Sequence, residues 1–106
     1  MELYLVGGAV RDMLVGRTPT ELDFAFDGTV EDFLDLHPDA RRVCKSVHVC
    51  LWRGRECMPL RGGGIEEDLA ARDLTINALA LDSAGMLHMH PQALEDLRQR
   101  ILRPAS

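Results

Sequence analysis

The chain has 106 residues, a hydrophobic fraction of 46% and a formal net charge of −5. The length predicts one small domain, and the apolar content is enough for a packed core and too high for a disordered chain. No apolar run approaches the roughly 20 residues that span a bilayer and there is no secretion-signal pattern, so we expect a cytoplasmic protein. The negative net charge argues against a broad RNA-binding surface on this chain.

The first half of the chain predicts two strands and two helices. Residues 3–6 form a short apolar run typical of a buried strand, and residues 9–15 follow as an amphipathic helix that ends at Gly16. Residues 21–27 alternate between apolar and mostly acidic side chains, which predicts a strand with one buried and one acidic face. Thr29 can cap a helix that runs to about residue 36, with acids in its first turn.

The second half predicts a hairpin, helices and a last short strand. Residues 46–52 and 55–60 favour a β-hairpin around Arg53-Gly54, followed by a flexible glycine-rich loop at 61–64 and a helix over 65–71. Asp73 can cap a helix over 74–81, and residues 86–89 and 91–99 predict a strand and a helix opened by Pro91. This order predicts an α/β or α+β fold with a small mixed sheet flanked by helices.

The cysteines do not predict a metal site. Cys44, Cys50 and Cys57 form no CxxC pair, and an odd number in an intracellular context predicts free thiols. His48 and Cys50 would share a strand face, but this spacing does not match the usual structural zinc sites. Buried cysteines and surface histidines are therefore preferred to zinc ligands.

A glycine pair, Gly7 and Gly8, separates the first predicted strand from the first helix. Such a turn lets backbone amides approach an anion at the start of a helix, and Arg11 stands in the first helical turn, where it could bind a phosphate. The alternative is a plain strand-to-helix turn with Arg11 and Asp12 on the surface. The glycine pair alone is therefore weak evidence of function.

Two acids, Glu21 and Asp23, stand two positions apart on the second predicted strand and would project from the same face. Neighbouring carboxylates repel each other, and a hard divalent cation such as Mg²⁺ offsets that repulsion by taking both as ligands together with substrate phosphates. The alternative is a solvated acidic face. Glu56 begins a strand that could lie beside them, although an exposed hairpin acid is nearly as good an interpretation.

Three segments, in this order and spacing, resemble the class II tRNA nucleotidyltransferase (CCA-adding enzyme) and bacterial poly(A) polymerase family. They are the run Gly7-Gly8-Ala9-Val10-Arg11-Asp12, the acid-x-acid strand of Glu21 and Asp23, and the run Arg72-Asp73-Leu74-Thr75-Ile76-Asn77-Ala78-Leu79. The similarity runs from residue 3 to residue 103, and the ordered set is highly specific. It implies a polymerase-beta-like nucleotidyltransferase head over residues 1–106, with the family's neck, body and tail domains outside this chain.

The resemblance also implies a role for each matching residue. The residues implied to bind the nucleotide are Gly7, Gly8, Arg11, Arg72, Asp73 and Asn77, and the implied catalytic acids are Glu21 and Asp23 as metal ligands, with Glu56 assisting. The 3′-hydroxyl of an RNA, in the first instance a tRNA, would attack the α-phosphate of ATP or CTP with Mg²⁺ as cofactor, and pyrophosphate would leave. No protein nucleophile is needed.

Two positions depart from the family pattern. Glu21 stands where the family has Asp, and His90 precedes Pro91 where the family has Asp. The longer Glu21 side chain loosens the geometry of a metal site. Two alternatives to an active enzyme domain remain, namely a nucleotide-binding module without independent catalysis and an inactive relative that makes protein contacts. The sequence does not distinguish CCA addition, A addition and poly(A) synthesis, and it does not give the oligomeric state.

Overall fold

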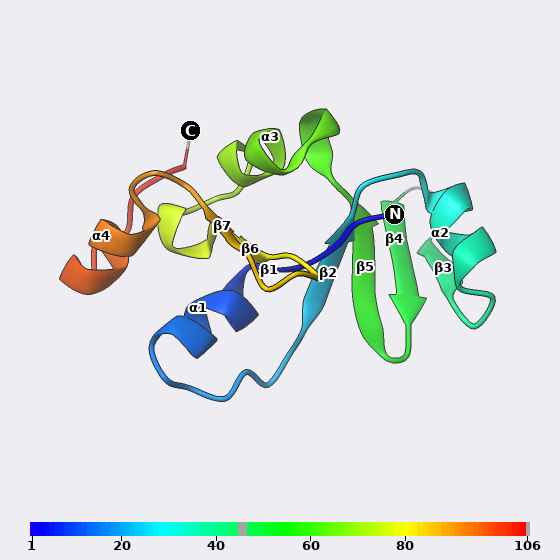
Figure 1. Cartoon of the computed structure of the whole chain (residues 1–106), viewed down its shortest axis with the longest axis horizontal. Coiled ribbons are helices and arrows are strands. Elements are labelled where there is room, and N and C mark those ends of the chain that lie inside the picture. The colour runs from blue at the N-terminus through cyan, green and yellow to red at the C-terminus, as the bar shows by residue number, and fades with distance from the viewer. Residues whose placement is uncertain (45–46, 106) are drawn as a thin grey trace.

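The computed structural model describes residues 1–44 and 47–105. Within them, the strands form one mixed sheet in the order β3-β4-β5-β2-β1-β6-β7 (Figure 1). The strands are β1 (Leu3–Val6), β2 (Asp23–Phe26), β3 (Arg41–Cys44), β4 (Val47–Trp52), β5 (Arg55–Pro59), β6 (Leu79–Leu81) and β7 (Leu87–Met89). The helices are α1 (Gly8–Leu14), α2 (Val30–Leu36), α3 (Ile65–Ala70) and α4 (Ala93–Gln99), with 3-10 turns η1 (Arg61–Gly63) and η2 (Thr75–Asn77). The predicted fold class is confirmed.

Four strand ends meet at one edge of the sheet. β1 and β2 are antiparallel with Val6 opposite Asp23, so the end of β1 lies beside the start of β2. β5 runs parallel to β2 and therefore starts at the same edge, and β6 is antiparallel to β1, with Ala80 opposite Val6. We call this place the convergent edge, defined by Val6, Asp23, Arg55 and Leu79 at the ends of β1, β2, β5 and β6.

Helices cover both faces of the sheet. On one face, α2 packs through Phe33, whose ring stacks on Phe26 of β2 with centroids 4.5 Å apart, while α1 and α4 pack on β6. On the other face, α3 and the C-terminal segment pack against Val6 and Ala25. Ala25 is fully buried, so the prediction of a strand with one buried and one acidic face is wrong beyond its first residue. The acids of this segment lie only at its two ends, with Glu21 and Asp23 at the convergent edge and Asp27 after the far end of β2.

The predicted helix over residues 74–81 is also wrong. Thr75–Asn77 form η2, and Leu79–Leu81 form β6 between β1 and β7. Asp73 does not cap a helix, since the residue that precedes η2 is Leu74 and no side chain caps this turn. The backbone carbonyl of Asp73 accepts a hydrogen bond from the N–H of Ala105 at 3.2 Å. Leu79 and Ala80 point to opposite faces of the sheet and are both buried, an arrangement that suits a strand covered on both sides.

Several other predicted elements are confirmed, and one strand was missed. Thr29 caps α2 by accepting a hydrogen bond from the N–H of Asp32, and β4 and β5 form the predicted hairpin. The loop predicted at 61–64 contains the short turn η1, and the last helix begins at Ala93 instead of residue 91. The strand β3 was not predicted, although it pairs with β4 along the sheet edge.

Two of the cysteines are free, fully buried and opposite each other on β4 and β5. Burial raises the pKa of the Cys57 thiol to about 11, so this thiol stays protonated at neutral pH. The sequence also offered Cys44 and His48 as possible zinc ligands, but their side chains lie outside the described part of the chain. Among the described residues, no helix is both long and apolar enough to cross a membrane.

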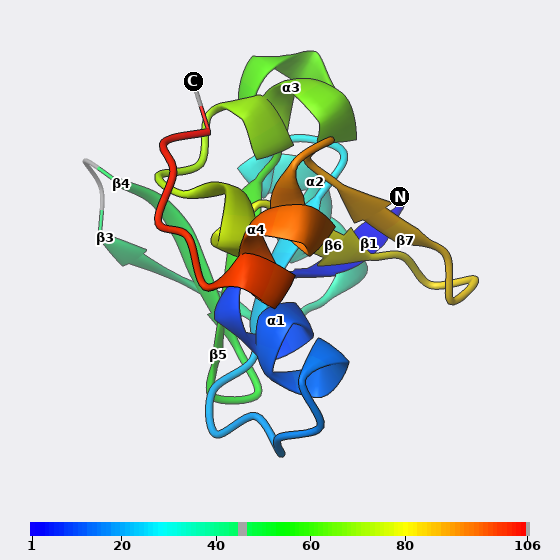
Figure 2. The ribbon, with the colours of Figure 1, turned by 90° about the vertical axis from the view of Figure 1, so that its left-hand side faces the viewer.

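The C-terminal segment returns over η2 and fixes its position (Figure 2). Pro104 forms a bridge with Leu74, and the backbone carbonyl of Arg103 accepts a hydrogen bond from the N–H of Thr75 at 2.9 Å. Below it, the buried carboxylate of Asp96 accepts hydrogen bonds from the Thr75 hydroxyl at 2.6 Å and from Nε of Arg103 at 3.0 Å. These contacts hold the turn that carries Asn77.

Candidate active site

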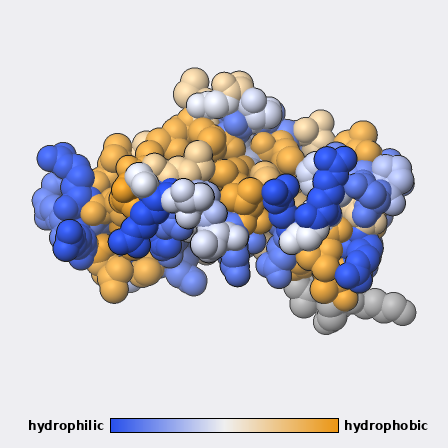
Figure 3. Space-filling model, turned by 90° about the horizontal axis from the view of Figure 1, so that it is seen from below, coloured by the Kyte–Doolittle hydropathy of each residue, from blue (hydrophilic) through white to orange (hydrophobic). Residues whose placement is uncertain are grey.

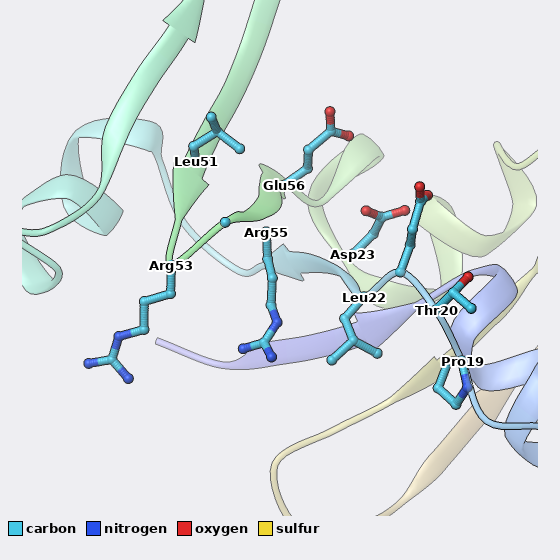
Figure 4. A pocket seen from close by; sticks show the side chains of 10 residues that line it. Pro19, Thr20, Leu22, Asp23, Leu51, Arg53, Arg55 and Glu56 are labelled. Carbon is cyan, nitrogen blue, oxygen red and sulfur yellow. The ribbon is translucent and has the colours of Figure 1, made fainter.

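A pocket of about 580 Å³ opens at the convergent edge (Figure 4). Its lining residues come from the segment that enters β2 and from the β4–β5 hairpin, and they are Pro19, Thr20, Glu21, Leu22, Asp23, Leu51, Arg53, Gly54, Arg55 and Glu56. All three acids that the sequence singles out, Glu21, Asp23 and Glu56, therefore line one hollow. We call it the carboxylate pocket.

Strand pairing explains why these acids meet. Asp23 is the first residue of β2, and Phe24 lies opposite Cys57 in the parallel pair of β2 and β5, which places Asp23 beside Glu56. The side chains of Asp23 and Glu56 point to the same side in Figure 4. Glu21 lies just before β2, so sheet hydrogen bonds do not fix its backbone as they fix that of Asp23.

The carboxylate pocket suits a cation that arrives with a substrate. No group of three or more His, Cys, Asp or Glu side chains within the described residues is arranged to hold an ion by itself. Mg²⁺ does not need such a group, because proteins usually bind it through one or two carboxylates while phosphates and waters complete the octahedron. Arg53 and Arg55 extend to the other side of the pocket from Asp23 and Glu56 (Figure 4). Arg53 pairs there with Asp39 at 3.2 Å, whereas Arg55 has no carboxylate partner among the described residues and can contact an anion.

A second group of predicted residues lies around the glycine turn. Gly7 has a φ of 73°, a left-handed conformation that favours glycine, and its N–H donates to the carbonyl of Leu79 at 3.0 Å. A Cβ on Gly8 would lie 3.3 Å from Nη2 of Arg11, so this turn leaves little room for a side chain. Nη1 of Arg11 donates to Oδ1 of Asn77 at 2.7 Å, which joins two predicted nucleotide-binding residues that are 66 positions apart.

Arg72 is held by an acid that the sequence analysis did not single out. Oδ2 of Asp68 accepts from Nη2 of Arg72 at 2.7 Å and from Nε at 3.1 Å, while Oδ1 accepts from the backbone N–H of Arg61 at 2.8 Å. Asp68 is only 1% exposed. The sequence does contain a pattern that could have identified Asp68, since an acid four residues before an arginine at a helix end is a common ion-pair spacing.

The remaining predicted residue is less engaged. Asp73 is exposed, and within the described chain its side chain makes no hydrogen bond. The position of Arg72 relative to the acids follows from Val6. Leu69 of α3 packs in one hydrophobic cluster with Val6, and Asp23 lies opposite Val6 on β2. Arg72 and the carboxylates are therefore on the same face of the sheet, with the glycine turn at the edge between them. This arrangement can bind a metal-bound polyphosphate.

Comparisons with known proteins agree with this geometry. The family described as the Poly A polymerase head domain matches residues 3–50. The CC-adding tRNA nucleotidyltransferase of Halalkalibacterium halodurans is 39% identical over 106 residues, which cover 96% of this chain and 28% of that protein. The Multifunctional CCA protein of Vibrio vulnificus is 38% identical over 125 residues, which cover 100% of this chain and 31% of that protein.

Solved structures show the same relationship. The Bacillus stearothermophilus CCA-adding enzyme in complex with CTP matches with a TM-score of 0.82 and 31% identity, over 98% of this chain and 29% of that chain. A tRNA nucleotidyltransferase complexed with a primer tRNA and an incoming ATP analog matches with a TM-score of 0.77 and 25% identity, over 99% of this chain and 36% of that chain. The chain thus spans about a third of the length of these relatives. It belongs to the CCA-adding enzyme and poly(A) polymerase family, within which it corresponds to the head domain.

Proposed function

We propose that residues 1–106 form the catalytic head domain of a template-independent RNA nucleotidyltransferase, which transfers AMP or CMP from ATP or CTP to an RNA 3′-hydroxyl. The main support is the meeting of Glu21, Asp23 and Glu56 in one pocket at the edge that also carries the glycine turn. The relatives add to this support, since one was solved with CTP and another with a primer tRNA and an ATP analog. We propose tRNA as the RNA and the cytoplasm as the place of action.

The chain's own residues position the reactants. Glu21 and Asp23 would hold a divalent cation, which we propose is Mg²⁺ and which, when bound, lowers the pKa of the attacking hydroxyl and neutralises phosphate charge. The backbone at Gly8 and the guanidinium of Arg11 would bind the triphosphate, with Arg72 on the same face to contact the nucleotide.

The bond changes balance without a protein nucleophile. The 3′-oxygen bonds to the α-phosphorus, the bond from that phosphorus to the bridging oxygen breaks, and pyrophosphate leaves with the electron pair. Glu56 lies in the same pocket as Asp23 and would assist there, in this proposal by accepting the hydroxyl proton. Positioning and charge neutralisation therefore account for the chemistry.

The direct test is calorimetric titration of ATP and CTP into the chain, with and without Mg²⁺. We expect Mg²⁺-dependent binding of both nucleotides, lost by at least about tenfold in Asp23→Asn because a neutral amide is a poor Mg²⁺ ligand. Asp27→Asn is the matched control, since Asp27 is an exposed acid at the other end of β2. An equal loss of nucleotide affinity in both variants, or binding that does not depend on Mg²⁺, would contradict the proposed metal site. Binding without primer extension would instead favour a nucleotide-binding module.

A further inference from the structure

A second hollow lies between α1 and α4, next to the loop that leads into β2. It has a volume of about 470 Å³, and its lining residues are Arg11, Asp12, Val15, Arg17, Leu97 and Arg100. α1 and α4 lie side by side in both ribbon views (Figures 1 and 2), and hydrophilic side chains gather at this end of the molecule (Figure 3). We call this hollow the arginine pocket.

The arginine pocket has a positive charge that the protein does not neutralise. Three arginines face a single carboxylate, that of Asp12, in a chain whose net charge is −5. Arg11 is engaged, since it contacts Asp12 at 3.3 Å and Asn77 at 2.7 Å. Most other arginines also have a carboxylate partner, but within the described residues Arg17 and Arg100 have none.

The backbone of Arg100 gives an independent reason to look at this place. Arg100 ends α4 in the left-handed conformation, with φ 58° and ψ 42°. Glycine is the usual residue at such a helix end, because a side chain there is strained. An arginine at this position is uncommon, and residues in strained conformations cluster at functional sites.

We propose that the arginine pocket binds a backbone phosphate of the RNA whose 3′ end is extended at the carboxylate pocket, an inference that rests on the proposed function. Arg17 lines the arginine pocket and Pro19 lines the carboxylate pocket. Two residues of extended chain span at most about 7 Å, so the pockets adjoin across this loop. An RNA with its 3′ end at the acids can thus reach the arginines with a phosphate upstream.

An RNA phosphate fits the arginine pocket better than the triphosphate of the incoming nucleotide. The guanidinium of Arg11 lies back beside Gly8, at the start of α1, whereas Arg17 follows the end of that helix. A helix of seven residues rises about 10 Å, so the free guanidinium of Arg17 belongs to a different phosphate from the one beside the glycine turn. The acidic surface elsewhere repels RNA, which makes two unpaired arginines effective anchors.

The test measures binding of a fluorescently labelled 12-nucleotide single-stranded RNA to the chain over a series of salt concentrations. The variant combines Arg17→Ala with Arg100→Gly. Glycine is favoured at the left-handed position, so the second change removes the guanidinium without harming the helix end. Arg41→Ala is the matched control, because Arg41 is an exposed arginine of β3, outside both pockets, and has no carboxylate partner in the described chain.

We expect the double variant to bind RNA about tenfold more weakly. The slope of log affinity against log salt concentration should fall by about 1.4, since each lost contact with a single strand contributes about 0.7. Arg41→Ala should change neither quantity. Mg²⁺-dependent ATP binding should be unchanged in the double variant, which separates this inference from the proposed function.

Three outcomes would overturn the inference. Unchanged RNA affinity in the double variant, or an equal loss in Arg41→Ala, would show that the arginine pocket holds no RNA phosphate. Loss of ATP binding together with RNA binding would assign the pocket to the nucleotide. In the first two cases the carboxylate pocket and the proposed function stand, because the Asp23→Asn titration tests them separately.

Discussion

At the residue scale, Glu21 is the position where this chain departs from the carboxylate pattern of its family. Its backbone lies just before β2 and its side chain is exposed, so the carboxylate can reach different positions. Glu21→Asp shortens the side chain and restores the family's pair of aspartates. We expect this variant to raise the efficiency of nucleotide transfer by up to about tenfold, because metal sites are sensitive to misplacement of this size.

The measurement is the Mg²⁺ dependence of primer extension, with Glu21→Gln beside Glu21→Asp. The glutamine variant keeps the size of the side chain and removes its charge, so it should need more Mg²⁺ and turn over about a hundredfold more slowly. If Glu21→Asp is slower than the natural chain, then the local backbone has adapted to glutamate and the family geometry does not apply here.

Single residues of the site were predictable where a local pattern located them. Alternation along residues 21–27 identified Asp23, and the hairpin around Arg53-Gly54 located Glu56 at the start of the next strand. The contact between Arg11 and Asn77 was not predictable, because it depends on β6 pairing with β1. Local sequence patterns therefore predicted which residue types the site contains. Which of them contact each other depends on the pairing of distant strands, and this was not predictable.

At the scale of elements, α3 acts as the support of Arg72. Asp68 is buried within α3 and binds both Arg61 and Arg72, so it joins η1, the helix and the segment after the helix. Asp68→Asn removes the charge and leaves two arginines without it. We expect the free energy of unfolding to fall by about 3 kcal/mol, as it does when one partner of a buried ion pair is removed.

Urea denaturation of Asp68→Asn and of Glu66→Gln tests this role, since Glu66 is an exposed acid of the same helix. The midpoint should fall in the first variant and stay within error in the second. If the Asp68 variant is as stable as the natural chain, water must replace the carboxylate at both arginines. Its affinity for ATP would then show whether Arg72 still reaches the nucleotide.

The elements that sequence patterns missed are those that depend on distant partners. Residues 74–81 have apolar side chains at spacings that suit a helix, but β1 and β7 offer backbone hydrogen bonds on both sides, and burial of Leu79 and Ala80 on opposite faces favours a strand. The edge strand β3 is partly exposed at Arg41 and Val43, so it lacks the apolar signal of a buried strand.

At the scale of the whole molecule, the distribution of charge suits a protein that handles two anionic substrates. The acids of the carboxylate pocket would repel both substrates unless a cation is bound, so substrate binding would depend on a divalent metal ion. The unpaired arginines stand in or beside the two hollows, apart from Arg41 on β3. A net charge of −5 therefore coexists with local attraction for phosphate.

The stability of the whole fold should depend on pH through Asp96, which joins η2, α4 and the C-terminal segment. Hydrogen bonds from Arg103 and then from Thr75 lower the pKa of its carboxyl below the usual 3.8. A lowered folded-state pKa means that the stabilisation is complete above the unfolded value and is lost as pH falls through the folded value. We therefore expect the melting temperature to drop as pH falls from about 4 towards 2.

Asp96→Asn isolates this contribution from those of other acids, such as Asp82 and Asp39, whose pKa values hydrogen bonds also lower. The variant should melt several degrees lower than the natural chain at pH 7, and this difference should shrink below about pH 4, where the natural carboxylate is itself being protonated. Asp35→Asn, at an exposed position of α2, should leave the whole curve unchanged. A difference between the natural chain and Asp96→Asn that stays constant down to pH 2 would mean that packing, and not the charge of Asp96, holds the C-terminal segment over η2.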